Sequence, residues 1–266
     1  MGTFNKWFLL LIVAGIMLIP ASTFGQNNKN DNGYPLKVMS YNLRFGERAT
    51  LEELAEYIKS ENPDVVALQE MDVRTHRAQA PHQNGKDFIT ELGYLTGMLT
   101  AYARTIDYSG GYYGIGILSK YPFEKTQKVL LPIPEGSREQ RAMLLADVEL
   151  PGGKRFTFVS THLDHSSSNV RKVQIEALNE ALTNNPLPLI VAGDFNGKPD
   201  SPEINAGMQN WNRACNSDFT FPSNNPELKI DYIFYTPSAN WTVKNAAVPK
   251  TQLSDHLPVT AEMELH

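Results

Sequence analysis

The chain has 266 residues, of which 41% are hydrophobic, which is enough for one large domain with a buried core. Its formal net charge of −5 argues against nucleic acid as the main substrate, because the Lys and Arg residues form no basic cluster. The single cysteine, Cys215, excludes an intrachain disulfide, so packing, with or without a bound metal, must stabilise the fold.

The N-terminal segment has the pattern of a signal peptide. Lys6 precedes an apolar stretch over residues 7–19, which is long enough for a signal-peptide core and short for a bilayer-spanning helix. We predict a signal peptide over residues 1–25, and therefore a secreted or periplasmic bacterial protein. Removing it takes away Lys6 and no acidic residue, so the net charge changes from −5 to −6. An uncleaved anchor is the alternative, but polar residues follow at once and no second apolar segment exists.

Polar, turn-prone residues 26–34 predict a flexible leader, so we expect one catalytic domain over residues 35–266. Short apolar runs rich in β-branched residues then recur and predict strands. The runs are residues 36–41, 65–68, 115–118, 143–150, 156–160, 189–192, 230–235 and 258–263.

Helix signals are fewer than strand signals. Thr50 to Glu53 form a capping-box pattern that opens a helix ending before Pro63, and apolar residues with a 3.6-residue period predict a helix over 168–183. A weaker pattern predicts a helix over 84–92. Pro151-Gly152-Gly153 between two strand runs predicts a hairpin, so part of the sheet is antiparallel. These signals favour a mixed α/β layered sandwich over a parallel Rossmann arrangement.

Polar and ionisable side chains gather where predicted strands end, where loops can project them into one cleft. They are Asn42, Glu70, His162, Asp164, Asp194 and Asn196, with Asp231 inside a strand pattern and Asp255-His256 before the last strand. Any one of these alone is more often a turn-former, a helix cap or a hydrogen-bonded structural group. Asp231, between Ile230 and Tyr232, would be costly to bury without a charged or hydrogen-bonding partner. The presence of so many polar residues at strand ends together indicates a functional site.

The candidate ligands are hard oxygens without cysteine, which point to Mg²⁺, with Mn²⁺ or Ca²⁺ as alternatives, rather than zinc. Magnesium needs only one or two protein carboxylates, which Glu70 and Asp255 would supply. Two histidines could then serve in acid–base or phosphate-stabilising roles, each oriented by a carboxylate. Serine-nucleophile chemistry is disfavoured because the sequence lacks a G-x-S-x-G motif.

Seven segments resemble motifs of the endonuclease/exonuclease/phosphatase superfamily, in the family's order. They are residues 38–42, 68–70, 114–119, 160–164, 193–196, 230–232 and 254–258, within a match from residue 36 to 264. The superfamily includes DNase I-like nucleases, abasic-site endonucleases, neutral sphingomyelinases and inositol polyphosphate 5-phosphatases. Gly-Asp-Phe-Asn together with Ser-Asp-His is fairly specific, whereas Gln-Glu alone is weak.

The resemblance implies a four-layer α/β sandwich of the DNase I type, in which two packed mixed or antiparallel sheets are flanked by helices. It implies a cleft at one edge of the sheets, with Glu70 on the metal and Asn42 and Asp255 close by. Asp194 would orient or deprotonate the attacking water, and Asn196 would hold a phosphate oxygen.

The resemblance also assigns roles to the histidines. His256, paired with Asp231, would act on the phosphate as a donor or acid–base group, and His162 would contact it from the other side. Nucleases of the family often carry an acidic residue that orients the first histidine, where this chain has residues 110–113, Gly-Gly-Tyr-Tyr. The orienting partner of His162 therefore stays open.

Three arginines, Arg44, Arg77 and Arg141, are candidate cationic contacts to a phosphate or a sugar acid, with solvated surface arginines as the alternative. The first hypothesis is an exported Mg²⁺-dependent phosphoesterase acting on a small-molecule or lipid-headgroup phosphate ester. The second is a secreted non-specific endonuclease. A third is a binding protein that has kept the fold without activity, which the intact candidate metal, water-positioning and histidine positions disfavour.

Overall fold

The computed structural model describes residues 1–2, 33–237 and 240–266. The predicted signal peptide from residue 3 onward, and all but the end of the predicted leader, lie outside the described residues. The first strand begins at Tyr34, the last residue of that leader. Among the described residues, none of the helices is both long and apolar enough to cross a bilayer.

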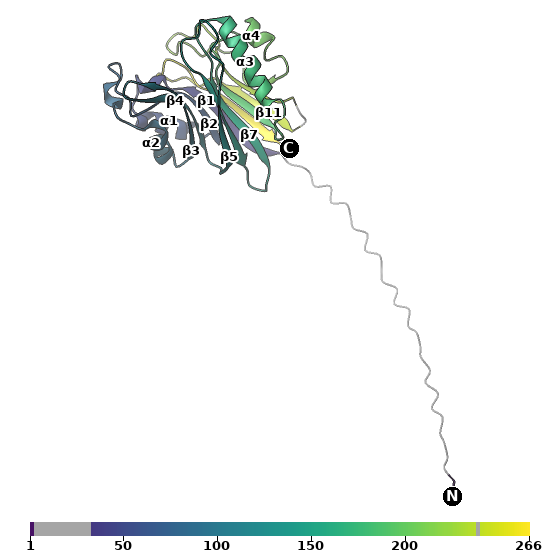
Figure 1. Ribbon diagram of the computed structural model, residues 1–266. Helices are drawn as coiled ribbons and strands as arrows, with labels where there is room; N and C mark the ends of the chain where they lie inside the picture. Colours follow the sequence, from purple (N-terminus) through teal and green to yellow (C-terminus); the bar gives the residue numbers. More distant parts are fainter. Residues whose placement is uncertain (3–32, 238–239) are drawn as a thin grey trace. The chain divides into compact units, whose positions relative to one another are not determined.

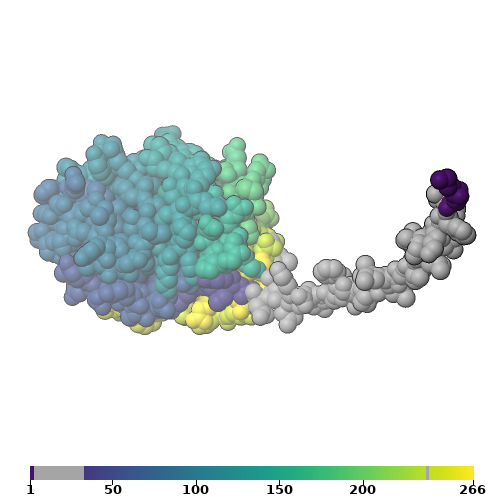
Figure 2. Space-filling model, turned by 90° about the horizontal axis from the view of Figure 1, so that it is seen from below, coloured from purple at the N-terminus to yellow at the C-terminus, as the bar shows by residue number. Residues whose placement is uncertain are grey.

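Two six-stranded mixed sheets form the centre of the domain in the described residues (Figure 1). The first has the order β11-β12-β1-β2-β4-β3, with β1 Tyr34–Asn42, β2 Val65–Val73, β3 Leu99–Tyr108, β4 Gly111–Ser119, β11 Trp241–Ala247 and β12 Val259–Leu265. The second has the order β5-β6-β7-β8-β10-β9, with β5 Phe123–Leu130, β6 Ala142–Glu149, β7 Arg155–His162, β8 Leu189–Asp194, β9 Asn212–Arg213 and β10 Asp231–Tyr235. In the space-filling view the purple start of the domain lies against the yellow C-terminal segment, as the antiparallel pairing of β1 with β12 requires (Figure 2).

Helices cover the outer faces of both sheets. Side chains of α1 Leu51–Glu61 and α2 Phe88–Thr96 pack with β1 and β2 in one core cluster, and those of α3 Ser168–Leu182 and α4 Pro202–Asn205 pack with β7, β8 and β10 in another. A third core cluster fills the space between the sheets, with residues such as Val38, Ile117 and Phe158. The predicted four-layer sandwich is therefore confirmed.

The predicted elements correspond closely to the observed ones where the signal was local. Thr50 and Glu53 form both hydrogen bonds of the capping box, and the Pro151-Gly152-Gly153 turn joins antiparallel β6 and β7. The weak helix over 84–92 was placed too early: it begins at Phe88, because the Asp87 side chain accepts from the Thr90 amide at 3.3 Å and caps it there. Strands β3, β5, β9 and β11 were not predicted.

The order of the strands brings the candidate residues to one end of the sandwich. β1 runs parallel to β2, with Asn42 opposite Gln69, and β7 runs parallel to β8, with His162 opposite Asp194. β10 is antiparallel to β8 and begins opposite Asp194 with Asp231. The last residues of β1, β7 and β8, the middle of β2 and the first residue of β10 therefore meet at one edge.

Candidate active site

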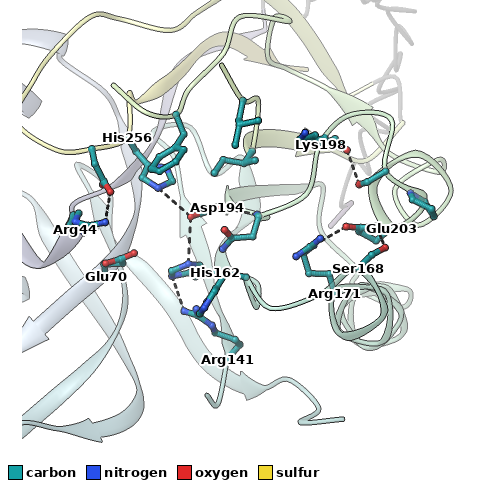
Figure 3. Close-up of a pocket in the computed structure, with 18 residues that line it drawn as sticks. Arg44, Glu70, Arg141, His162, Ser168, Arg171, Asp194, Lys198, Glu203 and His256 are labelled. Atoms are coloured by element: carbon teal, nitrogen blue, oxygen red, sulfur yellow. Dashed lines mark hydrogen bonds and ion pairs between the residues drawn. The ribbon is translucent and has the colours of Figure 1, made fainter. Parts of the chain in front are cut away.

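A cleft of about 540 Å³ lies at this edge of the two sheets (Figure 3). Eight of the residues predicted from the sequence line it: Arg44, Glu70, Arg141, His162, Asp194, Asn196, Asp255 and His256. Asn42 and Asp231 are buried behind that lining and contact residues within it. The structure therefore brings together ten of the twelve candidate residues. Asp164 is not part of the lining, and its carboxylate accepts from the backbone amides of Arg138 and Ser166.

Glu70 owes its position to an irregularity in β2. The register between β2 and β4 shifts between Leu68 and Met71, and Glu70 has a φ of 56°, in the left-handed region. Bulges of this kind often redirect a side chain beside an active site. The Asn42 amide donates to Glu70 Oε1 and to Asp194 Oδ2, both at 3.1 Å, and so links the two sheets.

Asp194 lies between the two histidines. Its Oδ2 is 3.5 Å from His162 Nε2 and 3.7 Å from His256 Nε2, and its Oδ1 accepts from the Asn196 backbone amide at 2.8 Å. Figure 3 shows the carboxylate between both rings. Burial, reinforced by the charge of Asp231, raises the pKa of Asp194 to about 7.

His256 is held by the carboxylate that the resemblance assigned to it. Its Nδ1 lies 3.0 Å from Asp231 Oδ2 and 3.2 Å from Oδ1. Burial alone would lower the pKa of His256, but the charges of Asp231 and Asp194 outweigh it and raise the pKa to about 10. The ring is therefore a cation at neutral pH, with Nε2–H directed at Asp194.

His162 differs from the sequence-based expectation at its Nδ1, where His256 has the Asp231 carboxylate. Its Nδ1 instead lies 3.0 Å from Arg141 Nη1. Burial lowers the pKa of His162 well below its usual range, and the positive charge of Arg141 lowers it further. The two histidines beside Asp194 are thus one cationic and one neutral.

Arg44 and Asp255 also line the cleft and form an ion pair with each other. Arg44 Nη1 is ion-paired with Asp255 Oδ2, and Arg44 Nε binds Glu47 at 2.6 Å. The backbone of Arg44 and Phe45 is left-handed, with φ of 44° and 42°, a costly conformation that tends to occur at functional sites. Asn42 Oδ1 accepts from the Arg44 backbone amide at 3.0 Å.

The structure also places Arg77 outside the cleft. Its guanidinium makes two hydrogen bonds to Asp72, at 2.6 and 2.9 Å, and lies 4.1 Å from the ring centres of both Phe45 and Tyr108. A cation fully engaged by a buried carboxylate and two rings supports the loop that carries Phe45.

A metal could be held in two places within the cleft. Asp194, Asp231 and His256 form a candidate metal site, the one group of three titratable ligands within 4.8 Å of one another that the described residues contain. Glu70 and Asp255, the ligands predicted from sequence, offer hard oxygens on the other side. Burial raises the pKa of Glu70, and a divalent cation bound there would favour the charged carboxylate instead. The donor set fits such an ion without deciding which one.

Residues that were not predicted form the far arm of the cleft. Glu203 is buried and accepts from Arg171 Nε at 2.7 Å and from the Ser168 hydroxyl (Figure 3). Lys198 lies exposed beside them. These residues come from the starts of α3 and α4 and the loop after β8, and no local pattern in the sequence separates them from ordinary helix-surface residues.

Comparison with known proteins identifies the family to which this chain belongs. The model of the endonuclease/exonuclease/phosphatase family matches residues 39–256, which is most of the chain. The chain belongs to the endonuclease/exonuclease/phosphatase family. Within it, the uncharacterized protein YbhP of Escherichia coli is 29% identical over 251 residues, covering 87% of this chain and 97% of YbhP.

Solved structures of other proteins share the fold of this chain. A family protein from Bacteroides vulgatus superposes with a TM-score of 0.71 at 21% identity, covering 87% of this chain and 99% of the other. A mannosyl-6-phosphatase from Bacteroides thetaiotaomicron superposes with a TM-score of 0.65 at 20% identity, covering 86% and 99%. At these identities the likeness concerns the fold alone.

Proposed function

We propose that this chain is an exported, Mg²⁺-dependent phosphoesterase that hydrolyses a phosphodiester or phosphomonoester of a small or lipid-derived substrate by direct attack of water. The observation that carries the proposal is the position of Asp194 between a cationic and a neutral histidine. A carboxylate that can take a proton, flanked by two N–H donors, suits in-line attack of water on a phosphoryl group.

Each residue of the site has a separate role in that attack. Asp194, anchored by the Asn196 amide, orients the water and accepts its proton as the new P–O bond forms. His256, charged through Asp231, donates a hydrogen bond to the phosphate and its proton to the departing oxygen as the old P–O bond breaks. His162 donates from Nε2 to another phosphoryl oxygen. Glu70 and Asp255 would hold Mg²⁺, which would neutralise charge on the phosphate.

The size of the cleft and the net charge of the whole chain support a small substrate. A volume of about 540 Å³ falls within the range of small-molecule sites, and the net charge of −5 disfavours a long polyanion. The structurally similar mannosyl-6-phosphatase is an example of this fold acting on a phosphomonoester. A secreted endonuclease is the second candidate, since the matched family also contains endonucleases.

A substrate panel tests the proposal. Bis-p-nitrophenyl phosphate, p-nitrophenyl phosphate, sphingomyelin, inositol phosphates and plasmid DNA would each be assayed with Mg²⁺, Mn²⁺ and Ca²⁺. We expect turnover of small esters that changes little with salt and is lost in Asp194→Asn. Preferential cleavage of DNA, with affinity that falls steeply as salt rises, would favour the nuclease instead. No turnover of any ester, in a folded and metal-loaded protein, would refute both.

Export is a separate part of the proposal and has its own test. The full-length chain would be expressed in a Gram-negative host, and the periplasmic and membrane fractions would be compared. We expect a soluble periplasmic form whose N-terminus is Gln26. Full-length protein retained in the membrane fraction would show that residues 1–25 act as an anchor.

A further inference from the structure

Arg141 is buried at the floor of the cleft and contacts the side chain of His162. Only 4% of Arg141 is exposed, and it directly precedes β6. β6 pairs with β7 through Met143 and Thr161, which brings Arg141 beside the end of β7 and within 3.0 Å of His162 Nδ1. Glu139 lies 2.8 Å from the same Nη1 atom and compensates the buried charge.

The chemistry of the two side chains decides which ring nitrogen carries the proton. A guanidinium only donates hydrogen bonds and stays protonated at any ordinary pH. The short contact therefore requires His162 Nδ1 to accept, which leaves the ring proton on Nε2. Nε2 faces the cleft and lies 3.5 Å from Asp194 Oδ2. His256 differs at the same atom, because its Nδ1 donates to Asp231.

We propose that Arg141 is a positioning residue that fixes His162 as a neutral Nε2–H donor toward a phosphoryl oxygen, and that it acts through this ring and not by touching the substrate. The proposal rests on the proposed phosphoesterase function for the role of that donor. The contact between Arg141 and His162 stands independently of the function. Arg141 would then be the partner that orients His162, since this chain has no acidic residue at positions 110–113 to do so.

The protonated nitrogen of His162 can be read directly by NMR. Metal-free protein labelled with ¹⁵N in its histidine rings would be recorded at neutral pH, with His162→Gln used to assign the signals. We expect a His162 ring protonated on Nε2 and bare on Nδ1. In Arg141→Met this preference should be lost, and in Arg141→Lys, which keeps a donor, it should be retained at least in part. A wild-type ring protonated on Nδ1 would overturn the proposal, even if no variant folds.

Kinetics on bis-p-nitrophenyl phosphate separate an indirect role from direct substrate contact. Arg141→Met should lower kcat by about tenfold to a hundredfold, as is usual for losing the group that orients a functional histidine, with KM changed less than about twofold. Arg141→Lys should recover part of kcat. Arg138→Met is the matched control, because Arg138 is an exposed arginine in the same loop, and it should behave as wild type.

A double-mutant cycle completes the test. In a His162→Gln background, Arg141→Met should lower kcat by less than about a further twofold, because the ring through which Arg141 acts is absent. An equal cost in both backgrounds, or a loss confined to KM, would show that Arg141 binds the substrate itself and would overturn the proposal. If no ester is hydrolysed but the NMR result holds, the proposed function fails and the positioning contact remains.

Discussion

Asp231→Asn should remove the largest of the contributions that keep His256 protonated. The rise in the pKa of His256 from 6.5 to about 10 corresponds to about 5 kcal/mol in favour of the charged ring, at about 1.4 kcal/mol per pH unit. Asp231, with Nδ1 of the ring at 3.0 Å, makes the largest favourable contribution. At pH 8 the ring of the variant should therefore be largely neutral and free to turn.

The assay is kcat on bis-p-nitrophenyl phosphate at pH 8 with saturating Mg²⁺. His256→Ala should lower kcat by at least about a hundredfold, the scale of losing an acid–base group, and Asp231→Asn should cost a similar amount. The double variant should be little worse than the worse single variant, because the two residues act as one unit. Asp218→Asn, an exposed aspartate between β9 and β10, is the matched control and should be neutral.

Two results would refute this reasoning. If the losses of the single variants multiply in the double variant, Asp231 and His256 act independently. If Asp231→Asn is fully active while thermal melting shows it folded, the carboxylate does not maintain the charge of the ring, and its role at the start of β10 is structural.

The remaining predictions concern metal, pH and the thiol. EDTA should abolish activity, and Mg²⁺ or Mn²⁺ should restore it; full activity in metal-stripped protein would contradict a hard-oxygen metal site. Glu70→Ala should chiefly raise the Mg²⁺ concentration needed for half-maximal rate, and an unchanged Mg²⁺ requirement would remove Glu70 from the ligands. In EDTA the free energy of unfolding should fall between pH 6.5 and 10 by up to about 1.4 kcal/mol per pH unit, because the folded state alone keeps the His256 proton there. Urea titrations should show this slope flattened in His256→Gln. Cys215→Ser should leave activity and Tm nearly unchanged, since Cys215 does not line the cleft; a large loss of activity without unfolding would indicate thiol chemistry.

The sequence alone determined the helices, turns and buried strands whose signals come from residues adjacent in sequence. The capping box of Thr50 and Glu53 is a local pattern, and so are the buried strands with a polar residue at their ends, such as Asp194 after 189–193. Edge strands carried no such signal. β5 lies at the edge of its sheet and is mostly exposed, so its polar sequence resembles that of a loop.

Only the tertiary structure decided which of these residues meet. Asn42 and Asp194 are 152 residues apart in sequence, and their contact depends on the two sheets packing face to face. Arg77 and Arg141 looked equivalent in sequence, yet one is engaged by Asp72 and the other by His162. The protonation of each histidine depends on the group that its Nδ1 faces, which lies 21 residues away in sequence for His162 and 25 residues away for His256.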